Sequence, residues 1–185
     1  MLTVTGLLAG CSTSPPTLGA AVGCNAQGAT ATAATTDYSL VLDVGPLAPM
    51  FSPGQVPSNV PPNAEVMLNG SMTGVSGPDA QHLEVHICNR RTGEVVAAAD
   101  PTITLTDTTA GTTVPVGVAT MEGVGAGQSD LHYGNNVLAP VGHSLVANVT
   151  VHGESATLRF VRGSEAPASS VPSTSVPLGT DSMSH

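Results

Sequence analysis

The sequence predicts an all-β protein, an immunoglobulin-like antiparallel β-sandwich of seven to eight strands with disordered N- and C-terminal tails. Three observations predict this fold. Short runs of alternating apolar and polar residues recur through the middle of the chain, turn-forming residues separate them, and no stretch sustains a helical period. The 185 residues have room for one ordinary domain once the polar ends are set aside. We divide the chain into segments 1–10, 11–36, 37–162 and 163–185.

The first segment, 1–10, is a short apolar run that leads into Leu7-Leu8-Ala9-Gly10-Cys11. This ending resembles the bacterial lipobox, where cleavage before the cysteine frees it for diacylglyceryl attachment. Cys11 would then anchor the protein by lipid on the extracytoplasmic side of the bacterial cell membrane. No positively charged region precedes Leu2, so we expect a signal truncated at its front. The alternative is a buried strand that ends in a cysteine, but the polar stretch that follows argues against it.

The two polar segments flank the predicted domain. Segment 11–36 contains hardly a large side chain and cannot bury enough apolar area to offset the entropy of ordering, so we expect a flexible tether. Segment 163–185 is rich in Ser and Pro, and we expect it to be disordered. Outside the cytoplasm thiols tend to be oxidised, so Cys24 and Cys88 can form a disulfide, although the sequence does not establish the pairing.

The first half of the domain shows the alternation of strands. The run 38–44 alternates and stops at the breaker pair Gly45-Pro46. A proline-rich stretch follows, and a strand resumes at 65–72. We expect 82–88 and 94–99 to form an antiparallel hairpin, because a glycine-containing turn separates them.

The second half continues the pattern. We predict strands at 102–106 and 114–121, where Pro115 indicates an edge position or a bulge. After a glycine-rich loop at 123–128, the last strands are 144–152 and 155–161, joined by a tight turn at Gly153-Glu154. The residues that we expect in the core between the two sheets are Leu83, Val85, Ile87, Leu145, Val149, Val151, Leu158 and Phe160.

The charge and the missing motifs exclude several functions. The chain carries a formal net charge of −9 and has no lysine, so it lacks the basic surface that binds nucleic acid. An acidic protein attracts cations, which weakly favours a metal ligand. No nucleophile elbow, phosphate-binding loop or Cys-x-x-Cys motif occurs, so we do not expect an enzyme.

The candidate site begins in the run His82-Leu83-Glu84-Val85-His86. Side chains alternate along a strand, so His82, Glu84 and His86 share one face. Imidazole and carboxylate groups are ligands for copper, zinc or iron, and Met121 and His132 are the natural contributors from facing segments. The alternative is that this polar face simply contacts water.

The combination of His82-Leu83-Glu84-Val85-His86 with a later Asp130-Leu131-His132-Tyr133-Gly134-Asn135-Asn136 resembles the periplasmic iron-transport protein family. Its members are small lipoproteins or periplasmic proteins of ferrous-iron uptake systems, with immunoglobulin-like folds that bind copper or zinc. The resemblance covers roughly 38–152. It implies an accessory metal-binding protein of iron or metal uptake, with a metal permease as a partner, and a homodimer is compatible with it.

The resemblance also implies a ligand set. His82 and Glu84 match the strand-borne histidine and glutamate of the family, His132 matches its His-Tyr-Gly histidine, and Met121 takes the place of its methionine. The family methionine lies closer to the His-Tyr-Gly element than Met121 does. A further family histidine has no clear counterpart, and His152 is the nearest candidate. His86 falls where the family needs no histidine, so we do not count it among the ligands.

A different class of function shares the same predicted fold. The chain could be a metal-free immunoglobulin-like module, displayed at the cell surface, that recognises another protein and carries its histidines as ordinary surface residues. The fold class alone does not separate this module from a metal-binding protein. Convergence of His82, Glu84 and His132 in space would favour the metal.

Overall fold

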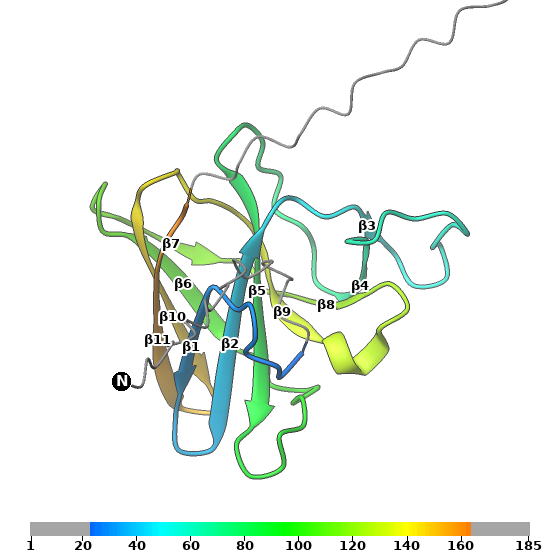
Figure 1. Ribbon diagram of the computed structural model, residues 1–185, viewed down its shortest axis with the longest axis horizontal. Helices are drawn as coiled ribbons and strands as arrows, with labels where there is room; N and C mark the ends of the chain where they lie inside the picture. Colours follow the sequence, from blue (N-terminus) through cyan, green and yellow to red (C-terminus); the bar gives the residue numbers. More distant parts are fainter. Residues whose placement is uncertain (1–22, 164–185) are drawn as a thin grey trace, which may run out of the picture.

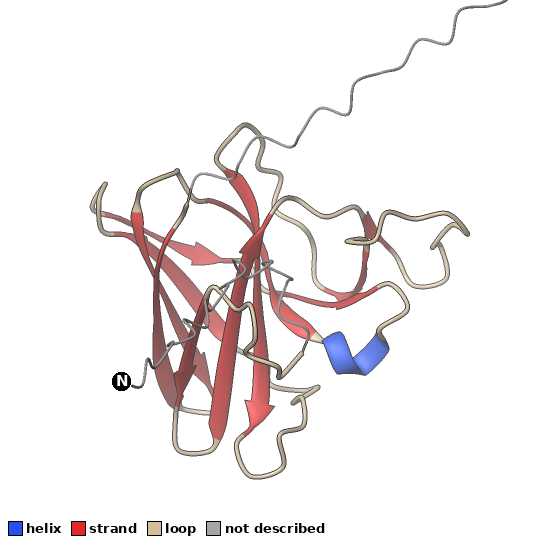
Figure 2. Cartoon of the chain, viewed as in Figure 1, coloured by secondary structure: helices blue, strands red, loops and turns tan. Residues whose placement is uncertain are grey.

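The computed structural model describes residues 23–163 and shows an all-β protein with two sheets (Figures 1 and 2). The only helical element among these residues is one turn of 3-10 helix, η1 (Gly127–Asp130). The predicted lipobox at Cys11 and the tail 164–185 lie outside the described residues. The strands are β1 (Ala31–Ala34), β2 (Tyr38–Gly45), β3 (Met50–Phe51), β4 (Glu65–Asn69), β5 (Ala80–Asn89), β6 (Thr102–Asp107), β7 (Thr112–Val116), β8 (Ala119–Gly123), β9 (His132–Leu138), β10 (Ser144–Val151) and β11 (Glu154–Val161).

The two sheets share one apolar core. The larger sheet has seven strands in the order β1-β2-β5-β9-β8-β4-β3, and the smaller has four in the order β11-β10-β6-β7. Strands β2, β5 and β9 face the smaller sheet through Leu40, Val85 and Tyr133, and β10 and β11 supply residues such as Leu145 and Leu158. All eight core residues predicted from the alternation are buried, so that prediction is confirmed.

Two of the expected strands differ in the structure. The run 114–121 is divided between β7 and β8, which belong to different sheets, and Pro115 lies in β7 at the edge of the smaller sheet as predicted. The run 94–99 forms no strand; it contacts β5 through one bridge between Cys88 and Val95 and a hydrogen bond from the Val96 N–H to the Ile87 carbonyl. A full hairpin was therefore a wrong expectation.

The domain also begins earlier than residue 37. Part of the segment 11–36, expected as a tether, forms β1, which pairs with β2 over four residues from Ala31 to Ala34. Small residues suffice there, because the strand needs only backbone hydrogen bonds to an existing edge. At the other end of the domain, the turn between β10 and β11 is formed by His152 and Gly153, one position earlier than expected, and both have positive φ.

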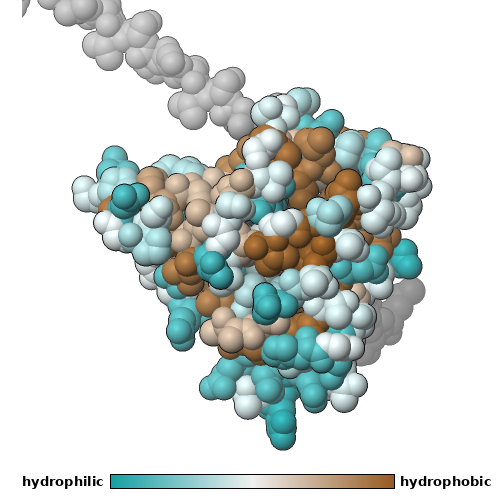
Figure 3. Space-filling view, turned by 180° about the vertical axis from the view of Figure 1, so that it is seen from behind, coloured by the Kyte–Doolittle hydropathy of each residue, from teal (hydrophilic) through white to brown (hydrophobic). Residues whose placement is uncertain are grey.

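The larger sheet extends beyond the smaller one. In Figure 1, β8, β4 and β3 lie to the right of the body formed by the two packed sheets, together with the long loops around them. The opposite side of the molecule, in Figure 3, has apolar residues gathered in its upper and central part and hydrophilic residues at its lower end. The extension matters because it carries residues over the outer face of β5 and β9.

A disulfide joins Cys24, ahead of β1, to Cys88 near the end of β5, across a sequence separation of 64 residues. The pairing that the sequence left open is therefore present. Disulfides persist in oxidising compartments, so this bond indicates an extracytoplasmic protein. Among residues 23–163, no helix is long and apolar enough to cross a membrane.

Removal of this disulfide should destabilise the domain measurably. For a closed loop of 64 residues, the loss of loop-closure entropy in the unfolded chain corresponds to about 4 kcal/mol. We expect the Cys24→Ala/Cys88→Ala double variant to lose that much free energy of unfolding in urea denaturation, and the wild type under reducing conditions to behave alike. A difference below about 1 kcal/mol would contradict a structural role for the bond.

Candidate metal centre

Three histidines and two glutamates gather on the outer face of the larger sheet, away from the shared core. His82, Glu84 and His86 come from β5, His132 from β9 and Glu65 from β4. A sheet face that points away from the core is usually hydrated, yet each of the three histidines is at most 1% exposed and Glu65 is 5% exposed. Glu84 is half-buried. The polar face of β5 is therefore a buried polar cluster.

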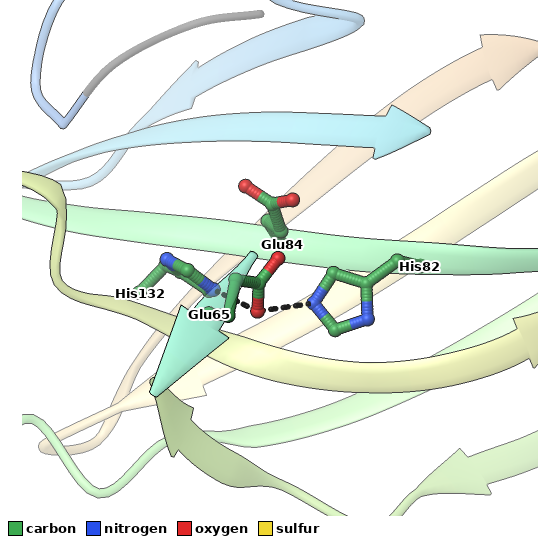
Figure 4. Close-up of side chains that lie close together, drawn as sticks. All are labelled: Glu65, His82, Glu84 and His132. Atoms are coloured by element: carbon green, nitrogen blue, oxygen red, sulfur yellow. Dashed lines mark hydrogen bonds and ion pairs between the residues drawn. The ribbon is translucent and has the colours of Figure 1, made fainter. Parts of the chain in front are cut away.

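The side chains converge on the carboxylate of Glu65 (Figure 4). Its Oε2 lies 3.2 Å from Nε2 of His82 and 3.3 Å from Nε2 of His132. Glu84 lies beside these three residues, and one ligand atom from each of the four lies within 4.8 Å of the others. Of the expected ligands, the structure thus brings His82, Glu84 and His132 together.

Strong coiling of the sheet makes this convergence possible. His82 pairs with Asn136, four residues beyond His132 along β9, an offset of about 13 Å in an extended strand. The ring centroids of His82 and His132 are nevertheless 6.1 Å apart. Strand β4, two places from β9 in the sheet, crosses over β9 and β5 in Figure 4 and carries Glu65 between the two rings.

Gly134 allows the two central strands to approach each other beneath the cluster. It is the cross-strand partner of Glu84, between the positions of His132 and Asn136. A Cβ at this position would overlap the backbone carbonyl oxygen of Leu83 in β5. Any other residue would force β5 and β9 apart, so the glycine of the His-Tyr-Gly element has a steric reason to be there.

Each histidine is held by its Nδ1 and directs its Nε2 into the cluster. The Nδ1 of His82 lies 2.8 Å from Oδ1 of Asn136, that of His132 lies 2.8 Å from the Asp130 carbonyl, and that of His86 lies 3.1 Å from the Leu131 carbonyl. Because all three partners are oxygen acceptors, each Nδ1 carries the hydrogen, and Nε2 carries the lone pair when the ring is neutral. This arrangement is typical of histidines that bind metals through Nε2.

Electrostatics ties Glu65 to the imidazoles. Burial by itself would raise the pKa of Glu65, but the hydrogen bond from His132 and the contact with His82 outweigh it and lower this pKa to about 2. Burial would lower the pKa of His132, but Glu65 and Glu84 outweigh it and raise the value to about 9. The pKa of His82 is raised as well, since Glu65 outweighs burial. The metal-free cluster therefore holds its protons on imidazoles beside a carboxylate.

The other two members titrate in the opposite sense. Burial raises the pKa of Glu84 to about 7, and the nearby Glu65 and Asp43 carboxylates add to the rise. Burial lowers the pKa of His86, and the charge on His132 lowers it further. Metal ions bind the deprotonated forms, so a cation entering the cluster would displace protons from His132 and His82 and keep Glu84 ionised.

The remaining predicted residues have different positions. Met121 in β8 is fully buried and is the cross-strand partner of His132, so its side chain shares the face of the cluster. His152 lies in the exposed β10–β11 turn of the smaller sheet, with its Nδ1 2.8 Å from the Tyr38 hydroxyl. The structure does not bring His152 to the cluster, because this turn belongs to the smaller sheet and the ring packs on Tyr38. The backbone of His152 has a φ of 48°, which suits the turn.

Two members of the cluster were missed from the sequence. Glu65 was assigned only to a strand, and the one available signal was a carboxylate inside the otherwise apolar run Ala64-Glu65-Val66-Met67-Leu68. His86 was set aside because the family needs no histidine there, yet it is fully buried, with its ring centroid 5.3 Å from that of His132. Its position on the same strand face as His82 was the signal that favoured it.

The arrangement can bind a metal ion. Ligands about 2.0–2.1 Å from a tetrahedral ion lie about 3.3–3.4 Å from one another, close to the two separations measured around Glu65 Oε2. Imidazole and carboxylate donors suit copper, zinc and iron alike. No protein-family model, curated protein or solved structure matches this chain.

The metal-free cluster should give the protein a pH-dependent stability that Glu65→Gln removes. Because the folded pKa of Glu65 is about 2 against an ordinary 4.5, its contribution is present above pH 4.5 and is lost as the pH falls towards 2. The raised pKa of His132, about 9, gives a contribution that is complete below pH 6.5 and is lost as the pH rises through 9. Both contributions are complete between pH 4.5 and pH 6.5. In this range Glu65→Gln should lose the most free energy of unfolding, on the order of 3 kcal/mol.

Urea denaturation of the chelator-treated protein across this pH range measures the effect. The matched control is Glu94→Gln, since Glu94 is an exposed glutamate in the loop after β5. It should change the free energy of unfolding by no more than about 0.5 kcal/mol. A pH-independent difference between Glu65→Gln and the wild type would show that the charge of Glu65 is not what stabilises the cluster.

Proposed function

We propose that this protein is an extracytoplasmic binding protein for a divalent transition-metal ion, copper, zinc or iron, rather than an enzyme. The observation that carries the proposal is the position of Glu65 Oε2, 3.2 Å and 3.3 Å from the Nε2 atoms of His82 and His132 inside a buried cluster. These three atoms are the proposed ligands. Glu84, on the same face, is close enough to supply a fourth oxygen.

The polar groups of the cluster favour a ligand over a purely structural role. Nε2 of His82 has an ion-pair contact with Oε2 of Glu65 at 3.2 Å but no well-aligned hydrogen bond, although the ring is buried. A metal ion could take the place of the proton between these two atoms, while the Nδ1 hydrogen bond to Asn136 fixes the orientation of the ring.

The finer proposal is that the protein is an accessory component of iron or metal uptake with an immunoglobulin-like sandwich, as in the periplasmic iron-transport protein family. The two sequence motifs that carry the resemblance meet in the cluster, which supports this proposal. Met121, the cross-strand partner of His132, is the proposed thioether ligand, and a soft ligand of this kind would favour copper. A metal permease of the same membrane is the proposed partner.

Calorimetric titration of the chelator-treated protein with Cu(II) and with Zn(II) tests the metal site. His82→Ala and His132→Ala should each weaken binding by more than the roughly 10–100-fold that loss of an outer hydrogen-bond partner costs, because each removes a ligand. His152→Asn is the matched control, since Asn tolerates the positive φ of this turn and the histidine lies outside the cluster. Unchanged affinity in both cluster variants would refute the proposed site.

The proposed location at the membrane depends on Cys11. We expect the mature chain, isolated from a bacterial envelope, to begin at Cys11 and to carry a diacylglyceryl group, since one lipid-modified cysteine with acyl chains is an anchor. Mass spectrometry of the N-terminal peptide measures this, and Cys11→Ser should leave the chain in the soluble fraction. A mature protein that starts elsewhere and lacks lipid would contradict the anchor.

A further inference from the structure

His86 is a buried histidine that the proposed metal site does not use. It is 0% exposed, its Nδ1 donates to the Leu131 carbonyl, and its Nε2 has no hydrogen-bond partner. The lone pair on Nε2 thus points into the protein with nothing to bind it. A buried polar atom without a partner is destabilising, so its presence calls for a ligand.

The groups around His86 are those that bind cations. Oε2 of Glu84 lies 4.0 Å away, and one ligand atom each from His86, Asp130 and His132 lie within 4.8 Å of one another. Two ligands about 2.0–2.2 Å from a tetrahedral ion lie about 3.3–3.6 Å apart, so His86 and Glu84 would have to approach each other by about 0.5 Å to contact one ion. This group adjoins the first one, since His132 belongs to both.

Asp130 reaches this position because residue 123 is a glycine. A Cβ on Gly123 of β8 would overlap Oδ2 of Asp130, so the carboxylate occupies the space that a side chain would fill. Asp130 also fixes His132, whose Nδ1 donates to the Asp130 carbonyl. Asp130 therefore serves both groups: its backbone carbonyl orients His132, and its carboxylate belongs to the group that contains His86.

We propose that the cluster binds two divalent ions side by side, the second held by His86 Nε2 and the Asp130 carboxylate, with Glu84 between the two ions. This inference rests on the proposed function, because the first ion is the one held by Glu65, His82 and His132. One nitrogen of His132 is committed to the Asp130 carbonyl and the other faces Glu65, so this ring serves the first ion.

The number of donors favours two ions over one. Six side chains supply a ligand atom to the two groups, namely Glu65, His82, Glu84, His86, Asp130 and His132. A tetrahedral ion takes four ligands, so a single ion would leave His86 without a partner and Asp130 unused. Shared between two ions, with Glu84 as the bridge, the same donors give four protein ligands to the first ion and three to the second. The second ion then keeps one position for water, and paired metals of this kind commonly lie about 3.5–4 Å apart.

Cu(II) is the probe for the test, added as its sulfate to the full chelator-treated chain. The wild type should bind about two ions per chain by calorimetry and elemental analysis, and its electron paramagnetic resonance spectrum at two equivalents should show coupling between the two copper spins. His86→Phe should bind about one ion, with an affinity within threefold of the tighter wild-type ion, and give the spectrum of an isolated Cu(II).

The outcomes separate this inference from the proposed function. One uncoupled ion in the wild type, unchanged by His86→Phe, would overturn the second ion and leave the first intact. One ion that His86→Phe abolishes would also overturn it, because His86 would then be a ligand of the only ion. No Cu(II) binding by the wild type would overturn both proposals.

Asp130→Asn and Gly123→Ala provide a second route if His86→Phe does not fold. Both should reduce the stoichiometry from about two ions to about one, the first by removing the carboxylate charge and the second by displacing Asp130. Gly123 does not have a positive φ, so alanine suits its backbone. Asp37→Asn, at an exposed position between β1 and β2, is the charge-matched control and should keep both ions. Retention of two ions by all three site variants would overturn the proposal.

Discussion

The contact of one carboxylate with two imidazoles is the interaction on which the site depends. Glu65 enters from β4, while His82 and His132 belong to β5 and β9, so the contact connects three strands that are not all neighbours. Buried charges are stable only when paired, and removing one partner of such a pair is more damaging than replacing the whole pair. In the metal-free protein protons on the imidazoles balance Glu65, whereas a bound cation would take over that role.

The shape of the larger sheet follows from the same requirement. A flat sheet would separate His82 in β5 from His132 in β9 along the strand direction and leave Glu65 beyond β8, with each side chain in water. Coiling brings them together, and the absence of a side chain at Gly134 lets β5 and β9 approach closely beneath them. The sheet thus has an apolar core on one face and a buried polar cluster on the other, which explains why both faces of β5 are buried.

The features that could be predicted from the sequence are those fixed by local alternation. The apolar parity of Leu83 and Val85 placed the core correctly, and the opposite parity put His82 and Glu84 on one face. Glu65 could not be predicted, because its approach depends on how far β4 crosses over β9, which no local pattern encodes. The division of 114–121 between β7 and β8 could not be predicted either. The alternation of apolar residues continues through this run, although the chain passes from one sheet to the other within it.

The directions of the three histidine rings provide the strongest argument that the cluster evolved to hold a ligand. Stability alone would be served by apolar residues of similar volume, which can replace buried ion pairs at no cost. Here each Nδ1 is instead fixed by an oxygen, from Asn136 or from the backbone of Leu131 and Asp130. The Nε2 atoms of His82 and His132 both face Glu65. Nε2 of His86 lacks a hydrogen-bond partner, and Nε2 of His82 has only its ion-pair contact with Glu65, so the metal-free cluster leaves its ligand atoms incompletely satisfied. Because binding free energy adds to folding free energy, a cation in the cluster would offset that cost and stabilise the coiled part of the sheet.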